Sequence, residues 1–87
     1  MKTITMLETS WCPYCKVARN LIQELKSEYP EYESIAVDYV DEEEFPEISS
    51  QYNYYYVPTI YHEKNKLHEG IPTKEIYQTI FQDLMNS

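Results

Sequence analysis

The chain has 87 residues, of which 43% are apolar and 25% are charged, values that are ordinary for a soluble globular domain. A chain of this length forms one domain, whose core is too thin to enclose a large cofactor. Seven basic and fifteen acidic residues give a net charge of −8, which repels a phosphate backbone or an anionic membrane surface. We therefore expect a single domain over residues 1–87, with its functional site on the surface and with no nucleic-acid or membrane partner.

The amino-terminal segment and the cysteine count indicate the cellular setting. Residues 1–6 lack the long apolar block and the small-residue cleavage site of a secretory signal. The chain also has no apolar run near the roughly 20 residues of a membrane span. Only two cysteines occur, at positions 12 and 15, which excludes a scaffold of several disulfides. We expect a cytoplasmic protein whose cysteine pair is either redox-active or metal-bound.

The first half of the chain predicts a strand, a helix and a second strand. Residues 2–8 alternate threonine with apolar side chains, which is a strand pattern. A helix begins at Pro13 and ends before Pro30, because a proline disfavours helical geometry in the residue before it. Residues 34–40 are rich in strand formers, and the tyrosines at 29 and 32 fall in the connecting loop. The apolar stripe of the helix consists of Val17, Ala18, Leu21, Ile22 and Leu25.

The second half predicts a short helix, a hairpin and a final helix. Pro46 suits the first position of a helix that runs to about Tyr52, and a strand begins directly after Pro58. Residues 63–66 form a turn, and residues 67–69 return as an antiparallel edge strand. The final helix carries the stripe Ile76, Tyr77, Ile80, Phe81 and Leu84. The fold class is α/β in the order βαβαββα, a four-stranded mixed sheet with the first and third helices on one face and the middle helix on the other.

The two cysteines lie where the first strand turns into the first helix. Cys12 ends the turn and Cys15 lies in the first helical turn, so the Cys12 sulfur is at the positive end of the helix dipole. This placement stabilises a thiolate, the reactive form of cysteine, and Lys16 and Arg19 lie close enough to add to the effect. A disulfide between the two would close so small a ring that it would restrict the unfolded chain little. A reversible disulfide is therefore the preferred interpretation.

A metal site is the rival interpretation of the cysteine pair. A structural zinc ion needs four ligands, and only His62 and His68 are available to complete the set. The strand-to-helix context favours a redox motif instead, so we interpret both histidines as surface imidazoles on the hairpin and expect no metal ligand. A cluster shared between two copies of the chain, with two cysteines from each, stays open as an alternative.

Two short motifs carry a resemblance to a known family. The segment Trp11-Cys12-Pro13-Tyr14-Cys15, with Val57-Pro58-Thr59 further along, resembles the thioredoxin superfamily over essentially the whole chain. The Pro-Tyr pair between the cysteines resembles glutaredoxins, while the tryptophan before them resembles thioredoxins. The resemblance implies a thioredoxin-like fold and a dithiol–disulfide oxidoreductase that acts in electron transport and cell redox homeostasis. It also implies a cis peptide bond before Pro58, beside the cysteines, with the Val57 backbone open to an extended substrate.

The resemblance also implies roles for individual residues. Cys12 is expected to be the nucleophile and Cys15 the resolving cysteine, in the reduction of protein or small-molecule disulfides. One or two of the tyrosines at 54–56 are expected to line the substrate groove, with at least one packing inward. The expected reductant is thioredoxin reductase or glutathione, with no bound cofactor, and the expected state is a monomer. The active-site turn would comprise Trp11, Pro13 and Tyr14, and the substrate-binding edge Val57, Pro58, Thr59 and Gly70.

Three features distinguish the chain from glutaredoxins. Glutaredoxins usually carry a basic residue two or three positions before the first cysteine, where this chain has Ser10 and Thr9. They usually have two glycines and an acid after the last strand, where only Gly70 matches. The acidic run 41–44 lies at the same end of the sheet as Cys12 and disfavours anionic glutathione, although solubility explains the run equally well. A protein-disulfide reductase is the leading hypothesis, and the alternatives are a glutathione-dependent glutaredoxin and a metal- or cluster-binding module.

Overall fold

The computed structural model describes residues 2–87; residue 1, with which the predicted domain begins, lies outside the described residues. The α/β class and the order of the elements confirm the prediction. None of the helices in the described part of the chain has the length and apolar character needed to cross a bilayer. In chain order the elements are β1 (Lys2–Glu8), α1 (Pro13–Glu28), the 3-10 helix η1 (Pro30–Ser34), β2 (Ile35–Asp41), α2 (Pro46–Ser49), β3 (Thr59–His62), β4 (Asn65–Glu69) and α3 (Lys74–Met85).

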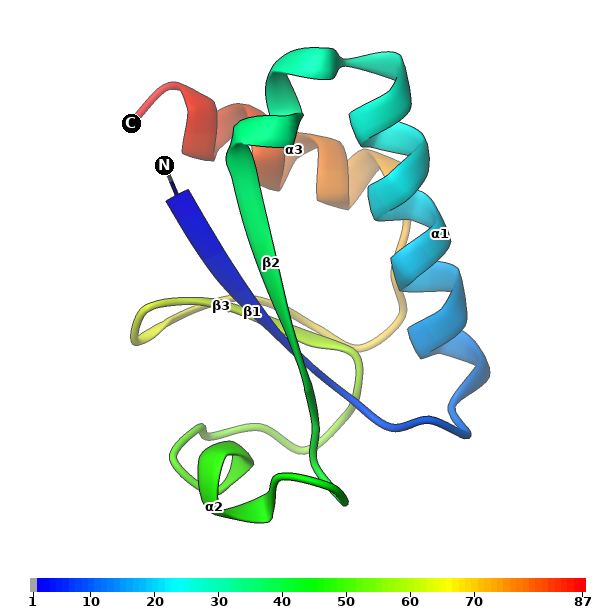
Figure 1. Cartoon of the computed structure of the whole chain (residues 1–87), viewed down its shortest axis with the longest axis vertical. Coiled ribbons are helices and arrows are strands. Elements are labelled where there is room, and N and C mark those ends of the chain that lie inside the picture. Colours follow the sequence, from blue (N-terminus) through cyan, green and yellow to red (C-terminus); the bar gives the residue numbers. More distant parts are fainter. Residues whose placement is uncertain (1) are drawn as a thin grey trace.

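The four strands form one mixed sheet in the order β2-β1-β3-β4. β1 runs parallel to β2, with Leu7 beside Val40. It runs antiparallel to β3, with Leu7 beside Thr59, and β4 is the antiparallel edge strand next to β3. The end of β1 and the start of β3 therefore lie at the same end of the sheet. The turn from β1 to α1 leaves the sheet at this end (Figure 1).

The larger core lies between the sheet and the two long helices, α1 and α3, which cover the same face (Figure 1). Strand alternation turns Ile4, Met6 and Ile60 toward these helices. Tyr77 and Phe81 of α3 are fully buried in the same core as these strand residues. This core fixes α1, and with it the cysteine pair, against β1.

A smaller core lies on the opposite face of the sheet. It consists of Leu7, Val40 and Tyr61, and the chain between α2 and β3 covers it with Tyr52, Tyr54 and Val57. Successive side chains of a strand point to opposite faces of the sheet. Met6 therefore packs into the larger core and Leu7 into the smaller one.

The segment after α1 differs from its prediction. Pro30 opens η1 instead of a loop, which takes Ser34 out of the predicted strand. Tyr32 is consequently buried, with its ring edge-on to Phe81 at 5.3 Å between centroids.

The buried stripe of α1 also differs from its prediction. It begins at Cys15 and leaves Val17 to one side, so that Val17 is 43% exposed. That stripe consists of Cys15, Ala18, Ile22 and Leu25.

Two further boundaries differ from their predictions. The middle helix ends at Ser49 rather than at about Tyr52, because the Tyr52 ring packs on Tyr61, with 4.8 Å between ring centroids. The edge strand begins at Asn65, two residues before the predicted start, because Asn65 pairs with His62 across the turn. Both differences come from contacts between segments rather than from local preference.

Candidate functional site

The cysteine pair occupies the first turn of α1. Cys12 is the N-cap residue, and its carbonyl oxygen accepts the N–H groups of Cys15 at 3.1 Å and Lys16 at 3.4 Å. Its side chain makes no hydrogen bond to the helix N–H groups, so the helix acts on this sulfur through its dipole rather than through a cap. Both cysteines are free thiols and are buried, while Pro13 and Tyr14 between them are exposed.

The segment before β3 faces the cysteine pair. The Val57–Pro58 peptide bond is cis, as the resemblance implied. The Cys12 thiol donates to the Val57 carbonyl oxygen across 3.8 Å. The Gly70 amide donates to the Pro58 carbonyl oxygen at 3.0 Å, and the φ of 103° at Gly70 is a conformation that favours glycine. The structure thus brings together the predicted residues Cys12, Val57, Pro58 and Gly70, with Thr59 buried behind them.

Cys15 is the more deeply buried of the two cysteines. Its exposed fraction is 2%, compared with 6% for Cys12. Burial raises the pKa of the Cys15 thiol to about 12, and the neighbouring Cys12 thiol and Glu8 carboxylate act in the same direction. At neutral pH Cys15 is therefore a thiol rather than a thiolate.

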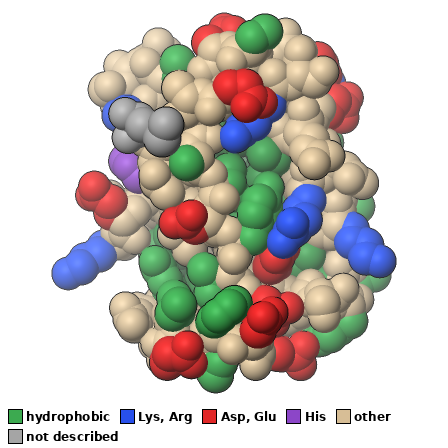
Figure 2. All heavy atoms as spheres, viewed as in Figure 1, with side chains coloured by type: hydrophobic (Ala, Val, Ile, Leu, Met, Phe, Trp, Pro, Cys, Tyr) green, Lys and Arg blue, Asp and Glu red, His purple; other side chains and the backbone are tan. Residues whose placement is uncertain are grey.

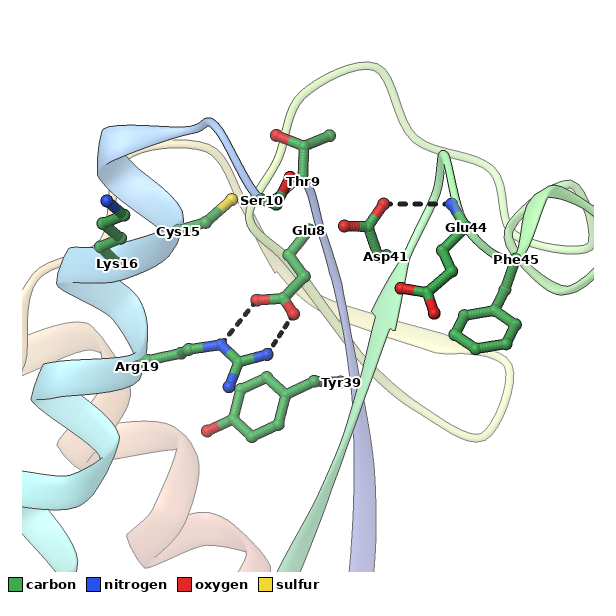
Figure 3. A pocket seen from close by; sticks show the side chains of 10 residues that line it. All are labelled: Glu8, Thr9, Ser10, Cys15, Lys16, Arg19, Tyr39, Asp41, Glu44 and Phe45. Atoms are coloured by element: carbon green, nitrogen blue, oxygen red, sulfur yellow. Dashed lines mark hydrogen bonds and ion pairs between the residues drawn. The ribbon is translucent and has the colours of Figure 1, made fainter.

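A cavity of about 390 Å³ opens between the start of α1, the end of β1 and the segment that follows β2 (Figure 3). Cys15 lines it. Arg19 reaches across from α1 to Glu8, with two guanidinium nitrogens on the two carboxylate oxygens. The guanidinium also lies 3.9 Å from the ring centroid of Tyr39. The Thr9 hydroxyl is buried in the cavity wall with no hydrogen-bond partner in the described part of the chain. The wall beside the buried thiol is therefore polar and charged.

The sequence prediction missed the ion pair between Glu8 and Arg19. Arg19, which was expected to favour the Cys12 thiolate, donates its hydrogen bonds to the Glu8 carboxylate, and these bonds hold the guanidinium and raise its pKa. Two sequence signals point to the pair. Glu8 continues the alternation of β1 residues that face α1, and Arg19 lies four residues after Cys15, on the same side of the helix. Lys16 is exposed, with its side chain at the rim of the cavity.

Exposed aromatic side chains directly precede both Cys12 and Val57 in the sequence. Trp11 is 68% exposed, Tyr55 86% and Tyr56 70%. Tyr54 packs inward against the smaller core, and its hydroxyl donates to Glu42 at 2.8 Å. The prediction that one of the three consecutive tyrosines packs inward is confirmed.

The acidic run 41–44 is folded against the active-site turn. The Trp11 indole N–H donates to the Glu43 carboxylate at 2.9 Å. The Asp41 carboxylate accepts the backbone N–H groups of Glu43 at 2.9 Å and Glu44 at 3.2 Å, which holds the loop in shape (Figure 3). The acids therefore form one border of the site.

The predicted surface position of His68 is wrong. Its imidazole is partly buried on β4, where its ring meets Tyr77 edge-on at 6.1 Å between centroids, and burial lowers the pKa of His68. His62 is also partly covered. Within residues 2–87, no three side chains of His, Cys, Asp or Glu gather in an arrangement that holds a metal ion.

A Cys-x-x-Cys pair at a strand-to-helix turn, opposite a backbone carbonyl on a four-stranded mixed sheet, defines a disulfide oxidoreductase of thioredoxin fold. The thioredoxin domain family matches residues 2–82. The chain belongs to this family and is a thiol–disulfide oxidoreductase. A thioredoxin from Methanocaldococcus jannaschii is 31% identical to it over 72 residues, which cover 83% of this chain and 82% of that protein.

Solved structures share the fold. A thioredoxin-like protein from Clostridium perfringens superposes with a TM-score of 0.72 at 27% identity, over 97% of this chain and 71% of that chain. The oxidised thioredoxin of Plasmodium falciparum superposes with a TM-score of 0.70 at 18% identity, over 94% of this chain and 79% of that chain. The arrangement of strands and helices is thus shared with these structures.

One carboxylate ties the aromatic segment to the edge strand. The Glu69 carboxylate accepts the backbone N–H groups of Tyr55 and Tyr56, the latter at 2.7 Å, and it pairs with Lys66 at 2.7 Å. The bond from Lys66 and then the two backbone bonds lower the pKa of Glu69 to about 2. The ionised form of Glu69 therefore holds the segment that leads into Pro58.

We expect the folding stability of Glu69→Gln to depend less on pH, in the acid range, than that of the wild type. A depressed pKa in the folded state means that the ionised carboxylate stabilises the fold above its unfolded pKa of about 4.3, and that this contribution is lost as the pH falls toward 2. The variant should unfold more easily in urea at neutral pH and lose less stability than the wild type between about pH 4 and pH 2. Glu33→Gln, at an exposed site on η1, is the control. Identical pH profiles for Glu69→Gln and the wild type would show that these bonds do not contribute.

Proposed function

We propose that this protein reduces protein or small-molecule disulfides, with Cys12 as the nucleophile and Cys15 as the resolving cysteine. The observation that carries the proposal is the position of Cys12, at the start of α1 and 3.8 Å from the Val57 carbonyl oxygen. The helix dipole favours a thiolate at this position. The backbone of Val57 offers an extended substrate a strand-like partner beside the sulfur.

The reaction transfers two electrons in two steps. The Cys12 thiolate attacks one sulfur of the substrate disulfide, a mixed disulfide forms, and the other substrate sulfur leaves as a thiolate that takes up a proton. Cys15 then gives up its proton and attacks the Cys12 sulfur. The mixed disulfide breaks, the second substrate thiolate leaves, and the Cys12–Cys15 disulfide remains. An external reductant returns two electrons before the next cycle.

The burial of Cys15 supports this order of attack. Because burial raises the pKa of Cys15 to about 12, the residue stays protonated at neutral pH and does not compete with Cys12 for a substrate. Cys12 is also next to the exposed side chains of Trp11 and Pro13, whereas Cys15 lines the cavity between α1 and the end of β1. A substrate therefore meets Cys12 first.

The surroundings of the pair favour a reductase as the source of electrons. Glu43 binds Trp11 at the border of the site, and like charges disfavour anionic glutathione there. Ile71 follows Gly70 where glutaredoxins carry a second glycine. We propose a protein-disulfide reductase of thioredoxin type that receives electrons from a thioredoxin reductase. We further propose that it acts in the cytoplasm as a monomer with no bound cofactor.

A glutathione-dependent glutaredoxin is the second candidate, which the Pro13-Tyr14 dipeptide between the cysteines supports. Parallel turnover assays, one with thioredoxin reductase and NADPH and one with glutathione, glutathione reductase and NADPH, distinguish the two. We expect at least about tenfold faster turnover with thioredoxin reductase, because the acidic border repels glutathione. Faster turnover with glutathione would favour the second candidate instead.

Two cysteine variants test the order of attack. With 5,5′-dithiobis(2-nitrobenzoate), Cys15→Ser should retain a stable mixed disulfide on Cys12, because no second thiol resolves it. Intact-mass spectrometry should show this adduct on Cys15→Ser and only slow labelling of Cys12→Ser at pH 7. Rapid labelling of Cys12→Ser together with an inert Cys15→Ser would reverse the two roles.

A further inference from the structure

We propose that the surface around Cys12 selects polypeptide disulfides that are flanked by basic residues. This inference rests on the disulfide-reductase function proposed above and adds the class of substrate. Two features carry it: a group of exposed apolar side chains, here called the aromatic patch, and a border of unpaired carboxylates, here called the acidic rim.

The members of the aromatic patch are sequence neighbours of the residues that meet at Cys12. Tyr55 and Tyr56 directly precede Val57, whose carbonyl oxygen accepts the Cys12 thiol. On the other side, Ile71 follows the glycine whose amide binds the Pro58 carbonyl oxygen. The members of the patch, with exposed fractions from 49% to 86%, are Trp11, Tyr14, Tyr55, Tyr56 and Ile71.

Such a patch fits a polypeptide better than a small disulfide. Large apolar side chains that gather on a surface mark an interaction site, and aromatic rings bury much area at low entropic cost. A small disulfide at Cys12 would leave most of these side chains in water. A chain that extends along Val57 on both sides of its disulfide would cover them.

Polar bonds hold the patch in place before a partner binds. Glu69 fixes the backbone of Tyr55 and Tyr56, and Glu43 accepts the indole N–H of Trp11. Groups that are already ordered lose less entropy on binding, so these bonds lower the cost of ordering the surface when a partner binds.

The acidic rim lies directly beside the patch. Its contact with the patch is the 2.9 Å hydrogen bond from Trp11 to Glu43. Figure 2 shows acidic side chains next to apolar ones at the lower end of the view, over α2 and the end of β2. The rim consists of Asp41, Glu42, Glu43, Glu44 and Glu47.

The charge of the rim is not neutralised within the described residues. Among residues 2–87, none of the ion pairs involves a rim carboxylate. Arg19 is held by Glu8, and Lys74 by Glu24 and Glu28. Charges that lie within a Debye length of about 8–10 Å of a docked chain act on it. The complementary partner is therefore a cationic segment, with its apolar side chains on the patch and its Lys or Arg side chains on the rim.

Two synthetic peptide disulfides test the inference. They have the same length and apolar residues, and the disulfide is flanked by Lys in one and by Glu in the other. We expect the wild type to reduce the Lys peptide with at least about threefold higher kcat/KM at low ionic strength, because rim charges act mainly on association. The preference should disappear at about 0.5 M salt.

Charge variants assign the preference to the rim. Glu43→Gln with Glu44→Gln keeps an acceptor for the Trp11 indole and removes two of the five rim charges, so the preference for the Lys peptide should be clearly smaller than in the wild type. The matched control, Glu31→Gln with Glu33→Gln, removes two exposed charges from η1 at the opposite end of the molecule (Figure 1) and should keep the wild-type preference.

The outcomes separate this inference from the proposed function. Equal reduction of the two peptides by the wild type at low salt overturns the inference and leaves the reductase function intact. A preference that is as large in the Glu43 and Glu44 variant as in the wild type overturns the role of the rim. If the wild type reduces neither peptide while dithiothreitol reduces both, the proposed function itself is contradicted.

Discussion

The contact between the Cys12 thiol and the Val57 carbonyl oxygen joins segments that are 45 residues apart. The pairing of the strands brings these two segments together. Because β1 and β3 are antiparallel neighbours, the last residues of β1 and the first residues of β3 lie at the same end of the sheet. A parallel pairing of these strands would place the start of β3 at the opposite end, away from the cysteines. The position of Cys12 and the position of the proposed substrate-binding edge thus both depend on the order of the strands in the sheet.

Beneath this contact, an ion pair between buried Glu8 and half-exposed Arg19 connects the sheet to the helix that carries both cysteines. Glu8 is 7% exposed at the end of β1, where an unpaired carboxylate would be costly. Arg19 supplies the opposite charge from α1, and the Tyr39 ring covers its guanidinium. The pair fixes the first turns of α1 relative to the end of β1. It also gives the cavity beside Cys15 a charged wall, close to a thiol that burial keeps protonated.

Local pattern was sufficient to predict the cysteine turn, the two long helices and the order of helices and strands along the chain, because each depends on spacing within a short segment. The contacts that define the border of the site are long-range and were not predicted: the bond from Trp11 to Glu43 spans 32 positions. The acidic run alone fits a soluble surface and a substrate border equally well, and its contact with Trp11 supports the substrate border proposed above. The burial of Tyr32 could not be predicted for the same reason. Its position between a helix and a strand gives no local sign that Phe81 covers it.

The proposed chemistry requires one ionised sulfur beside one protonated sulfur. Alkylation of the reduced wild-type protein with iodoacetamide from about pH 5 to pH 10, with each labelled position assigned by mass spectrometry, measures both. Cys12 should be labelled at pH 7 faster than an ordinary free cysteine. Cys15, whose pKa burial raises to about 12, should remain unlabelled until the pH is well above 9. Labelling of Cys15 at pH 7 as fast as Cys12, or of Cys12 no faster than free cysteine, would contradict the proposed division of roles.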